Sequence, residues 1–357
     1  MKRILLIKFR HIGDVLLSTP LIENLKLHFP TAKIDVAINE ECEPILSHNP
    51  HINQIFGYNR KDIKKSNFTN RILKELSFTK KIARQPYDLT INLTEGDRGT
   101  ILSYLTRSPL RFGYGPNIDK FFRFSLLTRE IYPDPWQHTV LKDLSFLKFL
   151  NLDVLKHRVK IYWLNHEKKS FLSKTNHVTK IDYIHFHPLS RWQFKCWNDY
   201  KVANLIDYIQ KKYDLRVILT AGPNRIEIER IQRIINLCKT PPIDLSGKLT
   251  LKELAFLSAH AKMFIGVDSA PMHIAAAVDT PVVALFGASY PSIWGPWDND
   301  LNITHFKNID GIQHSGKHSI ISNMNHQIFF DNKEMKRSFG MEYISLDDVK
   351  KVIDERL

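Results

Sequence analysis

Short apolar runs alternate with amphipathic runs along most of the chain, and this alternation is typical of parallel α/β units. The apolar runs have the length of strands, whereas the segments between them carry apolar residues at helical spacing. The alternation gives way after residue 111 to a stretch rich in Phe, Arg, Pro and Gly. For the first half we predict strands at 3–7, 33–38, 52–56, 89–93 and 158–163, helices at 15–29, 69–84 and 137–150, and an irregular surface at 111–136.

The alternation restarts at residue 183, after a polar, lysine-rich segment at 165–180 that we interpret as part of the crossing between two domains. Thr250 and Glu253 have capping-box spacing and open one of the later helices. The polar segment 302–337 shows no clear period. For the second half we predict strands at 183–187, 216–220, near 243, 263–267 and 281–286, and helices at 199–212, 224–237, 251–259 and 346–357.

The pattern therefore predicts two similar α/β domains in tandem. With 357 residues, 43% of them hydrophobic, the chain is long enough for two domains of ordinary size. We place a first domain at 1–175, a second at 176–340 and a final helical segment at 341–357. The N-terminal run MKRILLIKF is too short for a signal-peptide core, and no window approaches a membrane span in length, so we expect neither.

Charge and cysteine content narrow the function classes. The formal net charge of +14 indicates an anionic partner, such as nucleic acid, a phosphorylated sugar, a nucleotide or an acidic membrane surface. We do not favour nucleic acid, because no helix-turn-helix, zinc-finger or single-strand stacking pattern is recognisable. Three widely spaced cysteines favour a reducing compartment, and the scattered histidines predict no metal site. The sequence carries no indication of an oligomeric state.

The strongest candidate for a ligand site is the segment FIGVDSAPMHIAAA at 264–277. A buried strand runs into a polar turn at Asp268 and Ser269, and then into a slim helix whose first turn contains Pro271. Backbone N–H groups at a helix start suit a phosphate or diphosphate, and the carboxyl edge of a parallel sheet is where open α/β folds bind ligands. The alternative interpretation is a plain helix N-cap, with His273 packing on the helix.

Further turns follow other strands of the second half. The segment HPLSRWQFKCW contains Ser190, Arg191 and Lys195, which are suited to contact a phosphate, with Lys195 as a point charge on a leaving group. The alternative is a solvated loop over packed aromatic residues. A third turn at Gly222 and Asn224, with Glu227 nearby, is a candidate nucleoside site, and Gly287 in a fourth turn permits close backbone approach.

The turn after the first strand lacks the G-x-G-x-x-G pattern, so a nicotinamide or flavin dehydrogenase is not expected. It presents Gly13 followed by Asp14. A carboxylate near a helix start is often only a cap or a dipole partner. Its functional interpretation is a general base at the mouth of the first domain, facing a ligand held by the second.

Two charged segments have both a structural and a functional interpretation. The basic residues from Arg60 to Arg71 form either a solvated helix face or a surface that attracts phosphate groups of an acceptor. The sequence Asp298-Asn299-Asp300 matches a D-x-D metal pattern, but it follows Pro-Trp in a loop, so we predict a turn.

Taken together, the segments KFRHIGDVLLSTP, FKCWND, TAGPN and FIGVDSAPMHIAAAVDTPVVALFGAS resemble the lipopolysaccharide heptosyltransferases, a GT-B family (glycosyltransferase family 9) of Gram-negative bacteria, and most of all its type III branch. The resemblance implies two Rossmann-like domains with a cleft between them, the first for the acceptor and the second for the nucleotide sugar. It also implies a C-terminal helix that packs back on the first domain.

The activity implied by the resemblance is inverting transfer of L-glycero-D-manno-heptose from ADP-L-glycero-β-D-manno-heptose to a heptose of the lipopolysaccharide inner core. No cofactor and no obligatory metal are implied. A lipid-linked anionic acceptor and a basic surface imply a cytoplasmic enzyme that is peripheral on the inner face of the inner membrane. The alternatives are a type I or II enzyme, a related transferase with another donor, and a sugar-nucleotide or nucleic-acid binding protein.

The resemblance also implies roles for single residues. Asp14 matches the proposed catalytic base, Lys195 the lysine on the donor diphosphate, and Asp268 the aspartate on the donor heptose. Ser-Ala-Pro at 269–271 departs from the Thr-Gly-Leu of the type I pattern. The expected donor-binding residues are Ser190, Arg191, Lys195, Gly222, Asn224, Glu227, Asp268, Ser269, Ala270, Pro271, His273 and Gly287, and the expected acceptor-binding residues are Arg10, His11, Gly13, Arg60, Lys61 and Lys64.

Overall fold

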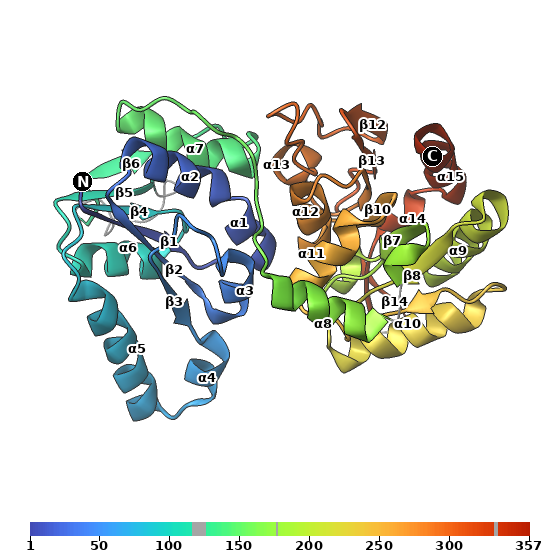
Figure 1. Cartoon of the computed structure of the whole chain (residues 1–357), viewed down its shortest axis with the longest axis horizontal. Coiled ribbons are helices and arrows are strands. Elements are labelled where there is room, and N and C mark those ends of the chain that lie inside the picture. Colours follow the sequence, from blue (N-terminus) through green and yellow to red (C-terminus); the bar gives the residue numbers. More distant parts are fainter. Residues whose placement is uncertain (116–125, 176–177, 332–334) are drawn as a thin grey trace. The chain divides into compact units, whose positions relative to one another are not determined.

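The computed structural model describes residues 1–115, 126–175, 178–331 and 335–357. The chain divides into two compact units, Met1–Tyr162 and Trp163–Leu357, each built on a mainly parallel sheet (Figure 1). We expected the boundary between the domains after residue 175, and the structure places it earlier, after Tyr162. Residues 176–177, next to the expected boundary, lie outside the described ranges. Residues 116–125 and 332–334, from the stretches predicted to be irregular, also lie outside them.

The first unit contains a six-stranded parallel sheet in the order β3-β2-β1-β4-β5-β6. This is the order of a doubly wound α/β fold, whose switch point lies between β1 and β4. Its strands are β1 (Arg3–Lys8), β2 (Lys33–Asn39), β3 (Gln54–Tyr58), β4 (Leu89–Asn92), β5 (Leu110–Tyr114) and β6 (Arg129–Ile131), and its helices are α1 (Ile12–Leu16), α2 (Thr19–His28), α3 (Glu43–Leu46), α4 (Arg60–Lys65), α5 (Phe68–Ala83), α6 (Asp97–Leu105) and α7 (Thr139–Phe149).

Three predictions for the first unit are wrong. The stretch 111–136, predicted to be an irregular surface, holds β6 and all but the first residue of β5. The helix predicted at 15–29 is two helices, and at the break Ser18 Oγ donates to Val15 O at 2.7 Å. The strand predicted at 158–163 is absent; this extended segment lies against α2, where Lys160 N donates to Thr19 Oγ1 at 3.1 Å. The segment 158–163 thus packs on α2 instead of joining a sheet, and a side chain of α2 hydrogen-bonds the backbone of this segment.

The second unit contains a seven-stranded sheet in the order β12-β13-β11-β10-β7-β8-β9, in which only β12 is antiparallel to its neighbour. From β13 to β9 the order repeats that of the first unit, with the switch point between β7 and β10. Its strands are β7 (Tyr183–His187), β8 (Arg216–Leu219), β9 (Ile243–Asp244), β10 (Met263–Val267), β11 (Val282–Phe286), β12 (Gly311–Ser315) and β13 (His318–Ser322), with β14 (Ile328–Asp331) and β15 (Met335–Ser338) forming a separate pair.

The segment 302–337, in which no element was predicted, thus contains four strands. The lysine-rich segment at 165–180 includes a regular helix, α8. The helices of the second unit are α8 (Asn165–Thr175), α9 (Asp199–Tyr213), α10 (Arg225–Leu237), α11 (Leu251–Ala259), α12 (Ala270–Ala277), α13 (Pro291–Trp294), α14 (Phe339–Tyr343) and α15 (Leu346–Arg356), with single 3₁₀ turns η1 (Glu40–Cys42) in the first unit and η2 (Val178–Lys180) and η3 (Gln193–Lys195) in the second.

The last helix, α15, packs within the second unit, on α9 and β13. Its Val349, Val352 and Ile353 belong to the same hydrophobic core as side chains of β7, β8 and β10. We expected this helix to return to the first domain, and its placement differs because its apolar side completes the core of the second unit. Among the described helices, none combines the length and the apolar character that crossing a membrane requires.

Candidate functional site

The loops after β7 and β10 are joined by a direct bond at the switch point of the second sheet. The two strands are parallel neighbours, with Gly266 opposite His187. Asp268 follows β10 directly and is buried, whereas Lys195 lies in η3, in the loop after β7. The Lys195 ammonium donates a hydrogen bond to the Asp268 carboxylate and forms an ion pair with it. Two turns that the sequence singled out separately are therefore one cluster.

The charge state of Asp268 is set by its neighbours. Burial raises the pKa of this carboxyl, but the charges of Lys195 and His273 and the hydrogen bond from Lys195 outweigh burial, so the pKa lies below its ordinary value. The Lys195 side chain keeps 21% of its surface exposed, so solvent or a ligand can reach it. The cluster therefore offers a buried carboxylate and an accessible cation side by side.

The predicted helix start lies beside this pair. Ser269 is the N-cap residue of α12, and Pro271 lies in the first turn. The Ser269 hydroxyl donates to Val267 O at 3.2 Å and does not cap the helix. The plain N-cap interpretation therefore does not describe this turn, and the backbone N–H groups at the start of α12 are suited to an anion. His273 is buried in the same helix, near Asp268.

A buried arginine that the sequence analysis missed holds the Lys195 loop in place. Arg230 of α10 is 1% exposed and pairs with Asp199 at 2.7 Å. It also donates to Gln193 Oε1 at 3.0 Å and to Trp197 O at 2.9 Å. Since Gln193 and Trp197 flank Lys195, Arg230 fixes both sides of that loop. A charged residue beside Ile231, on the apolar side of a predicted helix, was the available signal.

Two histidines support the strand end beneath this loop. Thr220 Oγ1 lies 2.8 Å from His187 Nδ1 and 2.7 Å from His185 Nε2. His185 Nδ1 in turn lies 2.9 Å from Ser258 Oγ. Burial lowers the pKa of His187 to about 4, so both imidazoles are neutral at pH 7 and serve as hydrogen-bonding groups of the scaffold.

The remaining residues of the predicted donor set have visible structural partners. Asn224 caps α10 by accepting from Ile226 N at 3.0 Å, and Glu227 accepts from Gly222 N at 2.9 Å. Ser190 Oγ accepts from Trp192 N at 3.2 Å, and the Arg191 guanidinium lies 5.3 Å from the Trp192 ring centroid.

The close approach predicted at Gly287 is made to the chain itself. A Cβ at this position would lie 2.4 Å from Met341 N, which only glycine avoids. Ser338 Oγ donates to Gly287 O at 3.0 Å and ties the same turn to the segment before α14. Gly287 therefore seats α14 against the end of β11.

In the first unit, the turn after β1 holds Asp14 in the first turn of α1. The Asp14 carboxylate is buried and accepts a hydrogen bond from Arg10 Nε at 3.1 Å. The turn is anchored from both neighbouring strands, because Phe9 N donates to Thr94 Oγ1 at 2.8 Å and Asn39 Nδ2 donates to Arg10 O at 2.8 Å. Asp14 is therefore a positioned carboxylate at the switch point of the first sheet.

A second buried polar cluster lies behind this turn, and the sequence analysis did not identify it. Lys8, at the end of β1, bonds Asp143 of α7 at 2.5 Å, and Tyr114 OH donates to the same carboxylate at 2.9 Å. Lys8 and Asp143 are almost fully buried. Burial raises the pKa of Asp143 against the opposing effects of Lys8 and Tyr114. The cluster links β1, β5 and α7.

The predicted acceptor residues fall on two elements of the first unit. Arg10, His11 and Gly13 surround Asp14 in the turn after β1. The exposed residues Arg60, Lys61 and Lys64 lie on α4, which follows β3.

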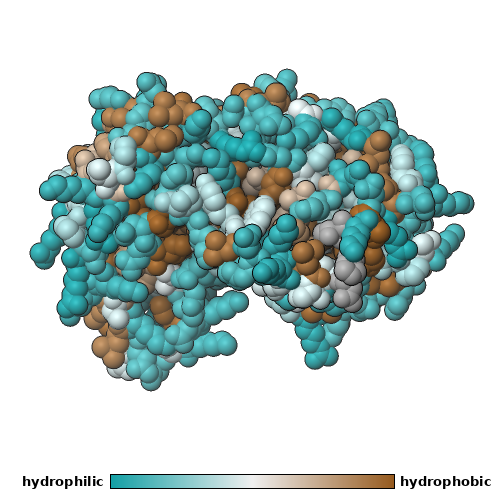
Figure 2. Space-filling view, viewed as in Figure 1, coloured by the Kyte–Doolittle hydropathy of each residue, from teal (hydrophilic) through white to brown (hydrophobic). Residues whose placement is uncertain are grey.

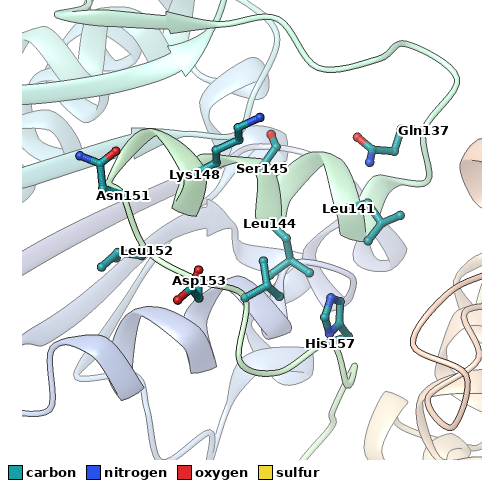
Figure 3. Close-up of a pocket in the computed structure, with 10 residues that line it drawn as sticks. Gln137, Leu141, Leu144, Ser145, Lys148, Asn151, Leu152, Asp153 and His157 are labelled. Carbon is teal, nitrogen blue, oxygen red and sulfur yellow. The ribbon is translucent and has the colours of Figure 1, made fainter.

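A shallow depression of about 620 Å³ lies on the first unit, along α7 and the chain that follows it (Figure 3). Asp143 is not among its lining residues, so it opens on another side of α7 than the Lys8–Asp143 bond. It contains none of the predicted site residues. Its lining consists of Gln137, Leu141, Leu144, Ser145, Lys148, Asn151, Leu152, Asp153, Val154 and His157.

In the ranges that the structure describes, no group of three or more His, Cys, Asp or Glu side chains is arranged to hold a metal ion. The D-x-D segment forms a turn, as predicted, in which Asp298 Oδ1 accepts from Asp300 N at 2.9 Å and from Leu301 N at 3.1 Å. The Asp298 carboxylate therefore stabilises the turn by accepting hydrogen bonds from backbone N–H groups.

Comparison with known proteins places these sites in a family context. A family model described as glycosyltransferase family 9 (heptosyltransferase) matches residues 75–322. The chain is 36% identical over 293 residues to lipopolysaccharide heptosyltransferase 3 of Escherichia coli, which covers 81% of this chain and 84% of that relative. It is 25% identical to lipopolysaccharide heptosyltransferase 2 of Salmonella typhimurium, with 84% and 87% covered.

Solved structures share the fold. A glycosyl transferase family 9 structure from Veillonella parvula matches with a TM-score of 0.80 at 23% identity, covering 99% of this chain and 97% of that one. ADP-heptose lps heptosyltransferase II of E. coli matches with a TM-score of 0.74 at 21% identity, covering 100% and 98%. The predicted GT-B architecture of two Rossmann-like units is confirmed.

Proposed function

The chain belongs to glycosyltransferase family 9, the heptosyltransferases, and on this premise we propose that it transfers L-glycero-D-manno-heptose from ADP-L-glycero-β-D-manno-heptose to a heptose of the lipopolysaccharide inner core. The observation that carries the proposal is the 36% identity to the type 3 enzyme across 81% of the chain. A type 1 relative from Campylobacter coli is 24% identical and a type 2 relative 25% identical. We therefore propose the type 3 acceptor ahead of the other two.

We assign donor binding to the second unit. The accessible Lys195 ammonium, held by Asp268, would balance the charge that develops on the leaving diphosphate. Backbone N–H groups at the start of α12 would bind the same group, and the Asp268 carboxylate would accept hydrogen bonds from hydroxyls of the donor heptose. The proposed donor set is completed by Ser190, Arg191, Gly222, Asn224, Glu227, Ser269, Ala270, Pro271, His273 and Gly287.

We assign the general base to Asp14 and acceptor binding to the first unit. The acceptor hydroxyl oxygen forms a bond to the anomeric carbon while the bond from that carbon to the diphosphate oxygen breaks. The hydroxyl proton passes to the Asp14 carboxylate, and ADP leaves with the electron pair. A single displacement inverts the anomeric centre. No metal takes part in this scheme, so transfer is expected to persist in EDTA.

A donor and acceptor panel tests the proposal. The protein is incubated with ADP-heptose and a series of truncated core oligosaccharides, and mass spectrometry detects addition of one heptose. UDP-glucose and GDP-mannose serve as control donors. Transfer from a control donor but not from ADP-heptose would contradict the proposed donor. Binding of ADP-heptose without transfer to any acceptor would favour a non-catalytic sugar-nucleotide binding protein.

We propose a peripheral location on the cytoplasmic face of the inner membrane, where a lipid-linked acceptor is presented. The formal net charge of +14 supports this location, because anionic lipids attract basic surfaces. Cell fractionation should find the protein with membranes at low salt and in the soluble fraction at high salt. A protein that is wholly soluble even at low salt would contradict the location.

A further inference from the structure

The outer side of α5 carries an apolar stripe that the core of its unit does not use. Phe68, Ile72, Leu73 and Leu76 recur at the spacing of one helical face, and we call them the α5 stripe. Phe68 is 78% exposed, Leu73 62% and Leu76 60%. Scattered exposed apolar residues are ordinary, but a run of four along one helix marks an interaction surface.

The stripe is distinct from the side of α5 that holds the helix to its unit. Ile82 is fully buried in the core, and the Phe78 ring centroid lies 5.2 Å from that of Tyr58. Farther along the chain, Arg98 of α6 bonds Glu75 at 2.9 Å and holds α6 beside α5. The helix is thus fixed by one side while the stripe remains outward.

The stripe lies within a strongly basic segment. Residues 60–84, which form α4 and α5, contain nine Lys or Arg and two acidic residues, a net charge of +7 and so half of the formal charge of the whole chain. Both acidic residues are already paired, Asp62 with Lys74 at 2.5 Å and Glu75 with Arg98 at 2.9 Å. Lys65 and Lys80 are exposed and have no ion pair with any residue that the structure describes. Figure 2 shows apolar side chains set among hydrophilic ones at the lower left, over the part of the first unit where Figure 1 labels α4 and α5.

We propose that the α5 stripe and the cations of the same segment dock the protein on an anionic lipid bilayer. Apolar side chains of an interfacial helix enter the boundary between headgroups and acyl chains, while Lys and Arg bind the headgroup phosphates. This proposal rests on the proposed function, because that function places the acceptor in a membrane. The docking proposal adds which surface of the protein contacts the lipid.

Charge selects the bilayer over other occupants. A second copy packed by two-fold symmetry would set this surface against itself, so that two segments, each of net charge +7, would repel each other. A nucleic acid would satisfy the cations and leave the stripe in water. An anionic bilayer satisfies both, because it offers phosphate groups at its surface and hydrocarbon beneath them.

Vesicle flotation tests the proposal with no nucleotide sugar and no lipopolysaccharide present, so its outcome does not depend on the proposed reaction. The full chain is mixed with vesicles of phosphatidylethanolamine and phosphatidylglycerol, or of phosphatidylcholine alone. We expect binding to the anionic vesicles only, weakened at least about tenfold by 0.5 M NaCl. The variant Phe68→Asp/Leu73→Asp should bind at least about tenfold more weakly than the wild type.

A matched control places the same changes on another exposed helix. Ile226 and Leu237 of α10 are exposed apolar residues of the second unit, and Ile226→Asp/Leu237→Asp should float like the wild type. Heptose transfer to a soluble, deacylated core acceptor should be unchanged in Phe68→Asp/Leu73→Asp, which shows that the variant is folded. Flotation of that variant at wild-type strength, or no wild-type binding to anionic vesicles at low salt, would overturn the proposal. A wild-type dimer that the Phe68 and Leu73 changes dissociate would overturn it in favour of self-association.

Discussion

Lys195 bonds the buried carboxylate of Asp268, and this bond joins the loops that leave adjacent strands β7 and β10. Because strand order brings these loops together, residues far apart in sequence form one charged pair. The pair fixes the Lys195 ammonium through the protein's own contacts, which reduces the ordering that a diphosphate ligand would have to impose.

Replacing Lys195 by methionine is expected to weaken ADP-heptose binding about tenfold to a hundredfold. A hydrogen bond to a charged group contributes about 1.5–3 kcal/mol, and the variant would also leave Asp268 without its cation. Isothermal titration calorimetry measures the affinity. Lys262→Met removes a lysine from the exposed pair with Asp182 and is the matched control. Equal affinities for wild type and Lys195→Met would remove Lys195 from the donor site.

Asp14→Asn should lower turnover about a hundredfold or more while leaving the fold and ADP binding intact, because the amide cannot accept the acceptor proton. Steady-state transfer rates and calorimetry with ADP separate the two effects. Asp97→Asn, which changes another carboxylate in the first turn of a helix of the same unit, should keep wild-type turnover. Full turnover in Asp14→Asn would exclude Asp14 as the base.

Arg230→Met should reduce the free energy of unfolding by about 3 kcal/mol, because it leaves Asp199 and the Trp197 carbonyl without their buried donor. Urea unfolding measures the loss. Arg233→Met, on the exposed side of the same helix, should change stability by less than about 0.5 kcal/mol. The variant should also bind ADP-heptose more weakly, since the Lys195 loop loses its Gln193 anchor.

Stability should fall as the pH drops from about 6.5 to 4, because burial lowers the pKa of His187 to about 4. In that window the unfolded chain binds a proton at this imidazole that the folded chain does not bind. The stabilisation is complete above pH 6.5 and its loss amounts to on the order of 3 kcal/mol by pH 4. Urea unfolding across this range should give a flatter profile for His187→Asn. An identical slope in that variant would contradict the assignment.

The alternating pattern was sufficient to predict most strands of both sheets and the turns that carry Asp14, Lys195 and Asp268. These turns follow strand ends, which apolar runs mark clearly. Arg230 and the Lys8–Asp143 pair were missed because long-range packing buries them, and a single charged residue gives no periodic signal. The strands within 302–337 were missed because their residues are mixed in polarity; β12 is an antiparallel edge strand, half covered.

The family resemblance led us to expect that α15 returns to the first domain. It lies in the second unit instead, because Val349, Val352 and Ile353 complete the hydrophobic core of that unit. The strand predicted at 158–163 failed for a related reason. Its backbone is bound by Thr19 of α2, a contact that no local pattern can reveal. The family itself and the GT-B architecture were predicted correctly from the motif segments.

The core shared by β7, β10 and α15 has a consequence for how the chain is made. Met341, Ile344 and Val349 pack on strands that are synthesised much earlier. The first unit can fold while translation continues, since domains fold as units from the N-terminal side. The hydrophobic core of the second unit stays incomplete and exposed during translation until residue 353 has left the ribosome. A nascent chain halted after β13 would present that core to chaperones.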